Sequence, residues 1–321
     1  MSAQPELKRV EDLWFSDATL ILRAQNSLFR VHSGILAARS SVFRDMIAFP
    51  QPPQAEGRPI DTVDGHPVVL LHDSATEAEV FLRAIFDSGF FERPPAPVDF
   101  YAVIGVMRLL HKYDVPYLFR RALSHLDSMY PSELDAFMEV HNEEVDQHVE
   151  FEDNDPIVPL TALRAAAEVG ATWLIPAAGY RFAYSREGLD STMNQLQIHE
   201  LKTYLMAYAE FVRATATIQQ LLRNLPLPMC DSGGLCLISV SKAHDILESW
   251  RRARQDCDPL MPFIFDLLGS RTGLCMFCSP FALGQFKVAR QIFWDNLPLL
   301  FGLPGWEDLK KMKKEVMDGV T

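Results

Sequence analysis

The apolar and polar positions near the N-terminus predict two short strands followed by two short helices. Residues 19–22 form an almost continuous apolar run, which is typical of a strand buried on both faces. Residues 24–27 supply a polar turn, and residues 29–31 form the return strand. Residues 33–37 and 41–47 have the length and pattern of short helices. The chain is therefore expected to begin with a β-hairpin and a helical pair.

The next apolar segments extend this mixed pattern. Several prolines interrupt residues 50–65 and predict a loop, and residues 68–71 read as another strand. Thr76 and Glu79 have the spacing of a capping box, which predicts the start of a helix. Two further helices are expected at about 99–111 and 115–129. Because strands and helices do not alternate regularly, the pattern predicts an α+β fold rather than a doubly wound sheet.

Beyond Pro131 the strand signals stop, and the pattern predicts an all-α region. An acidic run over 143–155 indicates a solvated loop between subdomains. We therefore expect three regions, at residues 1–130, 131–226 and 227–321. The helices expected in the last two regions lie at about 132–145, 157–169, 173–184, 199–225, 241–256, 281–295 and 306–318.

Charge and composition narrow the classes of partner. The chain has 321 residues and a formal net charge of −12, whereas binding to nucleic acid needs a concentrated basic surface. No apolar run approaches the roughly 20 residues that span a bilayer, and the N-terminal segment is too polar for a signal peptide. We expect neither nucleic acid nor membrane as a partner, and a location inside the cell, in the cytoplasm or nucleus.

The cysteines form the only serious candidate for a chemical site. All five lie between Cys230 and Cys278, which is unlike the spacing of a secreted disulfide scaffold. Cys230 with Cys236, and Cys275 with Cys278, form two pairs that together match a tetrahedral four-thiolate zinc site. Such a site is structural, because four protein ligands leave no open position for water.

Each pair has features that bear on this hypothesis. Gly233 and Gly234 indicate that the first pair lies in a loop, and Cys275-x-x-Cys278 has the tight spacing of a zinc knuckle. His244 is a substitute ligand and Cys257 a spare thiol. Two alternatives stay open: the thiols are small buried hydrophobes, or the C-x-x-C pair is a redox pair.

No catalytic motif is recognisable, so the sequence predicts a protein that is not an enzyme. It contains no G-x-S-x-G, H-E-x-x-H, P-loop or G-x-G-x-x-G pattern. His141, Glu144 and His148 have spacings that would bring them together on successive helical turns. The surrounding acidic residues favour a solvated surface for these three side chains.

The first 130 residues resemble the BTB/POZ family. The resemblance rests on the order of several short segments rather than on any single one. The whole chain, with its helical, cysteine-containing C-terminal region, looks like a group of BTB proteins found in fungi. The matching residues are Asp17, Phe29, His32, the run 36–40, Phe43, Met46, the run 68–71, Phe81, Leu82, Ile85, Phe86, Gly89, the run 109–115 and Leu118.

This resemblance implies a protein–protein interaction module, used as an adaptor or scaffold. Members of the family form homodimers or serve as substrate adaptors of cullin-based ubiquitin ligases. Dimeric members pair the Asp at the Asp17 position with a basic residue after the motif His, but Ser33 stands there. Cullin-binding members often carry a hydrophobic-x-Glu motif, whereas here Phe49 is followed by Pro50 and the first Glu is Glu56.

The residues expected to hold the BTB-type fold are Asp17, His32, Leu36 and Phe43. His32 lies where a strand meets a helix, and we expect it to cap the helix or to form a hydrogen bond within the fold. Two other functions stay open beside the adaptor: a homo-oligomeric regulator with no ubiquitin role, and an enzyme in the helical C-terminal half.

Overall fold

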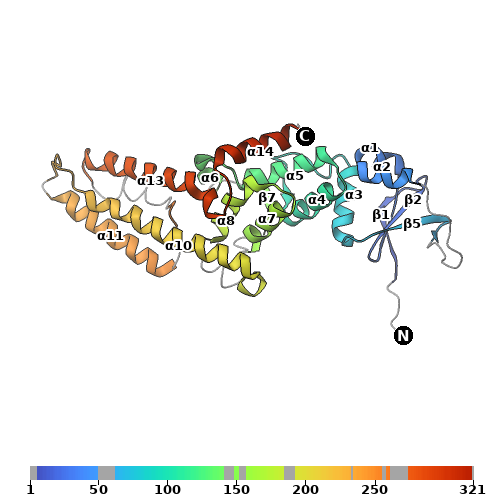
Figure 1. The fold of residues 1–321 in the computed structure, drawn as a ribbon, viewed down its shortest axis with the longest axis horizontal. Helices are drawn as coiled ribbons and strands as arrows, with labels where there is room; N and C mark the ends of the chain where they lie inside the picture. The colour runs from blue at the N-terminus through green and yellow to red at the C-terminus, as the bar shows by residue number, and fades with distance from the viewer. Residues whose placement is uncertain are drawn as a thin grey trace. The chain divides into compact units, whose positions relative to one another are not determined.

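The computed structural model describes two compact units (Figure 1). The first runs to Ser128 and includes residues 148–151, and the second begins at Met129 and holds the rest. The regions expected at 131–226 and 227–321 share this second unit, because α13 (Cys278–Leu300) packs against α8 (Ile175–Ala183) and α10 (Ile198–Gln220). The described residues are 6–49, 62–140, 148–151, 157–183, 192–232, 234–254, 258–260 and 274–319.

A curled five-stranded sheet forms the centre of the first unit, in the order β1-β3-β2-β5-β4. The predicted hairpin is present, with β2 antiparallel to β3, and β5 runs parallel to β2. Asp64 and Gly65 both have positive φ, the geometry of the tight turn that joins β4 to β5. The strands are β1 (Lys8–Trp14), β2 (Leu20–Ala24), β3 (Ser27–Val31), β4 (Thr62–Val63) and β5 (His66–Leu71).

Strand β1 was not expected from the sequence. It pairs in parallel with β3, and Lys8 lies opposite Ser27. Its residues are mostly charged, and only Leu13 among them is buried. A strand without an alternating apolar pattern depends on the edge that its neighbour offers, so local sequence does not reveal it.

Helices of the first unit follow the predicted positions closely. Phe43 stacks on Tyr113 with ring centroids 4.8 Å apart, and Phe81 lies against both rings. The capping box predicted at Thr76 and Glu79 is wrong. The helices are α1 (Ser33–Arg39), α2 (Ser41–Ala48), α3 (Ala75–Phe86), α4 (Phe100–Lys112) and α5 (Pro116–Met129).

The N-cap residue of α3 is Ser74, two residues earlier than predicted. The Ser74 hydroxyl accepts a hydrogen bond from the Glu77 amide and donates one to the Glu77 carboxylate. Glu79 instead accepts hydrogen bonds from Arg83, one turn further along the helix. The chain therefore enters the helix at Ser74, where the same spacing occurs in the sequence.

A second small sheet joins residues 148–151 to the first unit. Strands β6 (Val98–Asp99) and β7 (Val149–Glu150) pair in parallel, and the Phe151 ring lies 6.3 Å from that of Phe100. The acidic run was expected to be a loop throughout, so this pairing corrects the expectation at Val149 and Glu150. The rest of that run, residues 143–147 and 152–155, lies outside the described residues.

The second unit is helical. Trp294 is buried within it: the indole nitrogen donates to the Ser132 carbonyl at 3.0 Å, and Trp306 stacks on the ring at 5.2 Å. Across the described residues, none of the helices is both long and apolar enough to cross a bilayer. The helices are α6 (Leu134–Val140), α7 (Ile157–Glu168), η1 (Thr172–Leu174), α8 (Ile175–Ala183), η2 (Met193–Gln195), α10 (Ile198–Gln220), η3 (Leu221–Asn224), α11 (Leu235–Arg254), α13 (Cys278–Leu300) and α14 (Trp306–Asp318).

Candidate metal centre

Four cysteines from two distant parts of the chain meet in the second unit. The sulfur atoms of Cys230, Cys236, Cys275 and Cys278 all lie within 4.8 Å of one another. Cys236 is in the first turn of α11 and Cys278 is the first residue of α13. Both helices therefore have their N-termini at this group of cysteines. The partial positive charge at a helix N-terminus favours the thiolate form of a cysteine there.

The spacing of the sulfurs fits tetrahedral coordination. Four sulfurs bound at about 2.3 Å to a central ion are roughly 3.8 Å apart from each other. Cys230 Sγ and Cys275 Sγ are 3.9 Å apart, and both are free thiols. A disulfide needs about 2.05 Å between its sulfurs, so this separation matches shared coordination better than a covalent bond.

Backbone amides donate hydrogen bonds to the sulfurs of Cys236, Cys275 and Cys278. The Cys275 amide lies 3.1 Å from Cys236 Sγ, and the Cys278 amide lies 3.4 Å from Cys275 Sγ. The Leu227 amide reaches Cys278 Sγ at 3.5 Å. Such donors stabilise the charged form of a thiol and fix its direction, as the outer shell of a metal site does.

The Ser232 hydroxyl lies within hydrogen-bonding distance of the fourth sulfur, Cys230 Sγ. The hydroxyl oxygen accepts a hydrogen bond from the Cys236 amide at 3.0 Å and lies 3.1 Å from Cys230 Sγ. Because the oxygen already accepts from that amide, the hydroxyl proton is available to Cys230. Hydrogen bonds from the Ser232 hydroxyl and from the Ser232 backbone amide lower the pKa of Cys230 to about 7.

Burial acts in the opposite direction at Cys278. This side chain has no solvent exposure, and burial raises the pKa of its thiol to about 12. The unliganded group therefore combines one thiol that ionises near neutral pH with one that resists ionisation. A metal cation would supply the positive charge that lets both become thiolates.

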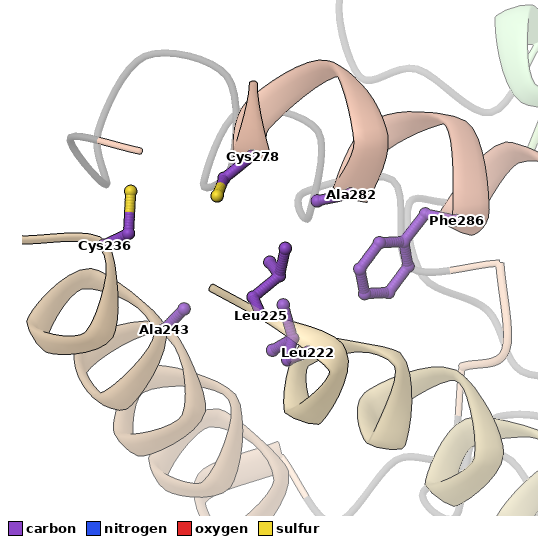
Figure 2. Packing of buried hydrophobic residues seen from close by; sticks show 7 residues of the cluster. All are labelled: Leu222, Leu225, Cys236, Ala243, Cys278, Ala282 and Phe286. Carbon is purple, nitrogen blue, oxygen red and sulfur yellow. The ribbon is translucent and has the colours of Figure 1, made fainter. Parts of the chain in front are cut away.

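An apolar cluster closes one side of the group. Figure 2 shows Leu222, Leu225 and Phe286 packed in the same cluster as the buried cysteines Cys236 and Cys278. Cys230 and Cys275 are half-buried and pack against the same cluster. The four cysteines could hold one thiophilic metal ion, with hydrogen-bond donors around their sulfurs and the apolar cluster packed against them.

No protein-family model, curated protein or solved structure matches the chain.

Sequence reasoning found all four cysteines of this group but misplaced one of them. Cys236 was expected in a loop and lies in α11, because Gly234 ends the turn and the helix begins at Leu235. His244 is exposed on α11 and takes no part in the group. Cys257 lies outside the described residues. Ser232 was missed, although a hydroxyl two residues after a candidate ligand is a signal that could have been used.

The other sequence candidates lie in the first unit. His32 is at the N-cap position of α1 but makes no capping hydrogen bond, and its ring nitrogen lies 3.5 Å from a carboxylate oxygen of Asp17. Leu36 and Phe43 are fully buried, as expected of core residues.

His148 was expected on a solvated surface and is instead half-buried. Its ring lies 5.3 Å from the ring of His125, and its Nε2 atom is 3.3 Å from the Ser128 hydroxyl. Residues 141 and 144, the other two members of the proposed cluster, lie outside the described residues.

The second unit also contains a cavity of about 420 Å³, which is within the usual range for small-molecule sites. Arg164 and Glu200 line it and bind each other through two hydrogen bonds of 2.7 Å. That pairing lowers the pKa of the Glu200 carboxyl. The apolar lining includes Leu160, Leu163, Ile175, Phe182, Tyr204 and Phe301.

Proposed function

We propose that this chain is a non-enzymatic protein-interaction protein, used as an adaptor or scaffold. Its first unit would be a BTB/POZ-type domain, and its helical second unit would be closed by a structural zinc ion. The order of elements supports the BTB assignment: the β2–β3 hairpin, the α1–α2 helical pair, β5 returning parallel to β2, and then α3, α4 and α5.

The observation that carries the docking function is the exposed apolar surface of α1 and α2. These helices bury Leu36 and Phe43 completely. Ile35, Val42 and Ile47 are each about 40% exposed (42%, 41% and 40%), and Phe49, which follows α2, is 73% exposed. Large apolar side chains gathered on one short pair of helices are typical of a surface that binds another protein.

Affinity capture from native extract tests this proposal. We expect a Val42→Asp/Ile47→Asp variant of the full chain to lose proteins that the wild type retains. Ile198→Asp is the matched control, because Ile198 is 90% exposed on α10 in the other unit. An identical set of co-purifying proteins for all three chains would contradict docking through α1 and α2.

Two further measurements separate the forms that this function can take. Binding of the purified chain to a purified cullin would support a ubiquitin-ligase adaptor. A homo-oligomer that ignores cullin would support a scaffold or regulator with no ubiquitin role. A monomer that ignores cullin would contradict both.

The four cysteine sulfurs support the proposal of a zinc ion. Four cysteine sulfurs within 4.8 Å of one another suit zinc or an iron–sulfur centre, and full coordination by protein ligands is the mark of a structural site. Elemental analysis of purified protein should find about one zinc per chain. Substoichiometric zinc after purification without chelators would leave the cysteines as packing residues.

The cavity beside Arg164 favours a second candidate, a small-molecule site in the second unit, which an enzyme would also need. Native mass spectrometry of the full chain should then show a bound small molecule. Ala167 lines the cavity, and Ala167→Trp should fill it and remove the additional mass. Absence of any bound mass from the wild type would count against this candidate.

A further inference from the structure

Helix α13 has two apolar faces, of which the inner one is buried and the outer one is largely exposed. The inner face contains the residues buried against the rest of the unit: Cys278, Ala282, Phe286, Arg290, Trp294, Leu297 and Pro298. The outer face carries Phe281, Val288, Ile292 and Leu299. The last three are 57%, 58% and 58% exposed, and Phe281 is 38% exposed.

The four outer residues form one narrow stripe. At 100° per residue they fall within an arc of about 40°, on the side of the helix away from the inner face. From Phe281 to Leu299 the stripe is about 27 Å long at 1.5 Å per residue. With Gln285 and Asp295 between them, the positions follow the alternating spacing of three and four residues that pairs one helix with another.

The stripe is also symmetric about its own centre, the level of residue 290. Val288 and Ile292 lie two residues on either side of this level, and Phe281 and Leu299 lie nine residues on either side. The two polar positions, Gln285 and Asp295, lie five residues on either side. A second copy of α13 running antiparallel about a two-fold axis at this level would therefore place apolar against apolar and polar against polar.

We propose that the outer face of α13 pairs with α13 of a second copy of this chain. In that pair Val288 packs on Ile292 of the second copy, and Phe281 packs on Leu299 of the second copy. A two-fold interface uses the same patch on both subunits, so it requires a patch that is complementary to itself. This inference does not depend on the BTB assignment or on the metal.

Charge in and beside the stripe is compatible with this pairing. Asp295 is the only charged residue among the four stripe residues and the two polar positions between them. The positions on either side of the stripe are Gly284, Ala289, Gln291 and Asn296, none of which is charged. In the antiparallel pair each Asp295 faces Gln285 of the second copy, whose amide can donate to the carboxylate. The two Asp295 carboxylates are about 15 Å apart along the axis, at 1.5 Å for each of ten residues.

The test is the mass of the full chain in solution, measured by sedimentation over a range of concentrations. We expect a dimer that dissociates on dilution, and a monomer for Val288→Asp/Ile292→Asp. Met206→Asp is the matched control, since Met206 is 60% exposed on α10, and it should dimerise like the wild type. A wild-type monomer at every concentration, or a dimer in the double variant, would overturn the proposal.

Position 285 tests the antiparallel register itself without touching an apolar residue. Gln285→Lys places a cation opposite Asp295 of the second copy and should tighten the dimer by about fivefold, whereas Gln285→Glu should weaken it by a similar factor. Adding Asp295→Lys to Gln285→Glu should restore dimerisation. Equal effects of Lys and Glu at this position would overturn the antiparallel register.

Discussion

Gly179 in α8 lies directly against the ring of Phe301, where α13 ends. A Cβ atom at Gly179 would be 2.5 Å from Cζ of that ring, a distance that no real contact sustains. Phe301 also lines the cavity of the second unit. The absence of a side chain at residue 179 therefore sets how closely α8 and the end of α13 approach.

Gly179→Ala should consequently destabilise the second unit by about 1–3 kcal/mol, since the added methyl group forces the ring or the helix to move. Gly284→Ala in α13 is the matched control. No atom lies within 4 Å of a Cβ there, and alanine should stabilise that helix by about 0.5–1 kcal/mol. Urea unfolding of both variants provides the comparison, and equal stabilisation by the two alanines would contradict the close packing.

Replacement of a buried cysteine should remove the metal. We expect Cys236→Ser and Cys278→Ser to lose the bound zinc and part of the helical circular dichroism of the second unit, because three thiolates and a hydroxyl make a weaker site. Cys257→Ser replaces the fifth cysteine of the chain and serves as the comparison, which should retain about one equivalent if the four described cysteines are the ligands. Retention of metal by Cys278→Ser would rule this residue out as a ligand.

Ser232→Ala should weaken metal binding and make it more sensitive to acid. The Ser232 hydroxyl lowers the pKa of Cys230, so its loss raises that pKa and lets protons compete for the sulfur at higher pH. We expect affinity to fall by about tenfold in a chelator competition, and release on acidification to begin at a higher pH than in the wild type. Ser241→Ala, an exposed position on α11, should leave both properties unchanged.

The first unit should lose stability as the pH falls below about 6.5. Burial lowers the pKa of both His125 and His148, so the unfolded chain takes up protons before the folded chain does. Their contribution is complete above the ordinary histidine pKa of 6.5 and is lost as the pH falls toward their lower folded values. In urea unfolding at pH 7.5 and 5.5, His148→Gln should lose less stability than the wild type.

His244→Gln is the control for this pH dependence, because His244 is exposed on α11 in the other unit. It should show the same loss of stability between the two pH values as the wild type. A wild-type first unit of equal stability at pH 7.5 and 5.5 would show that the rings of His125 and His148 accept protons without loss of stability.

The periodicity of the chain identified most helices of both units, including the long helix from Ile198 to Gln220. The helix starts that were predicted wrongly were wrong by a few residues, for physical reasons. The capping spacing occurs twice near the start of α3, and sequence alone did not favour Ser74 over Thr76. Helix α13 begins at Cys278 rather than near Phe281, and Cys278 packs into the apolar cluster from that first turn.

The sequence by itself determined the mixed α/β character of the N-terminal part, the helical remainder and the identity of the four cysteines. Tertiary structure alone decided that β1 joins β3, that residues 148–151 return to the first unit, and that the two cysteine pairs meet. The physical reason is range. Helix periodicity and caps arise from neighbours within a few residues. Strand pairing and the contact between Cys236 and Cys275, which are 39 positions apart in the sequence, form only when the chain packs.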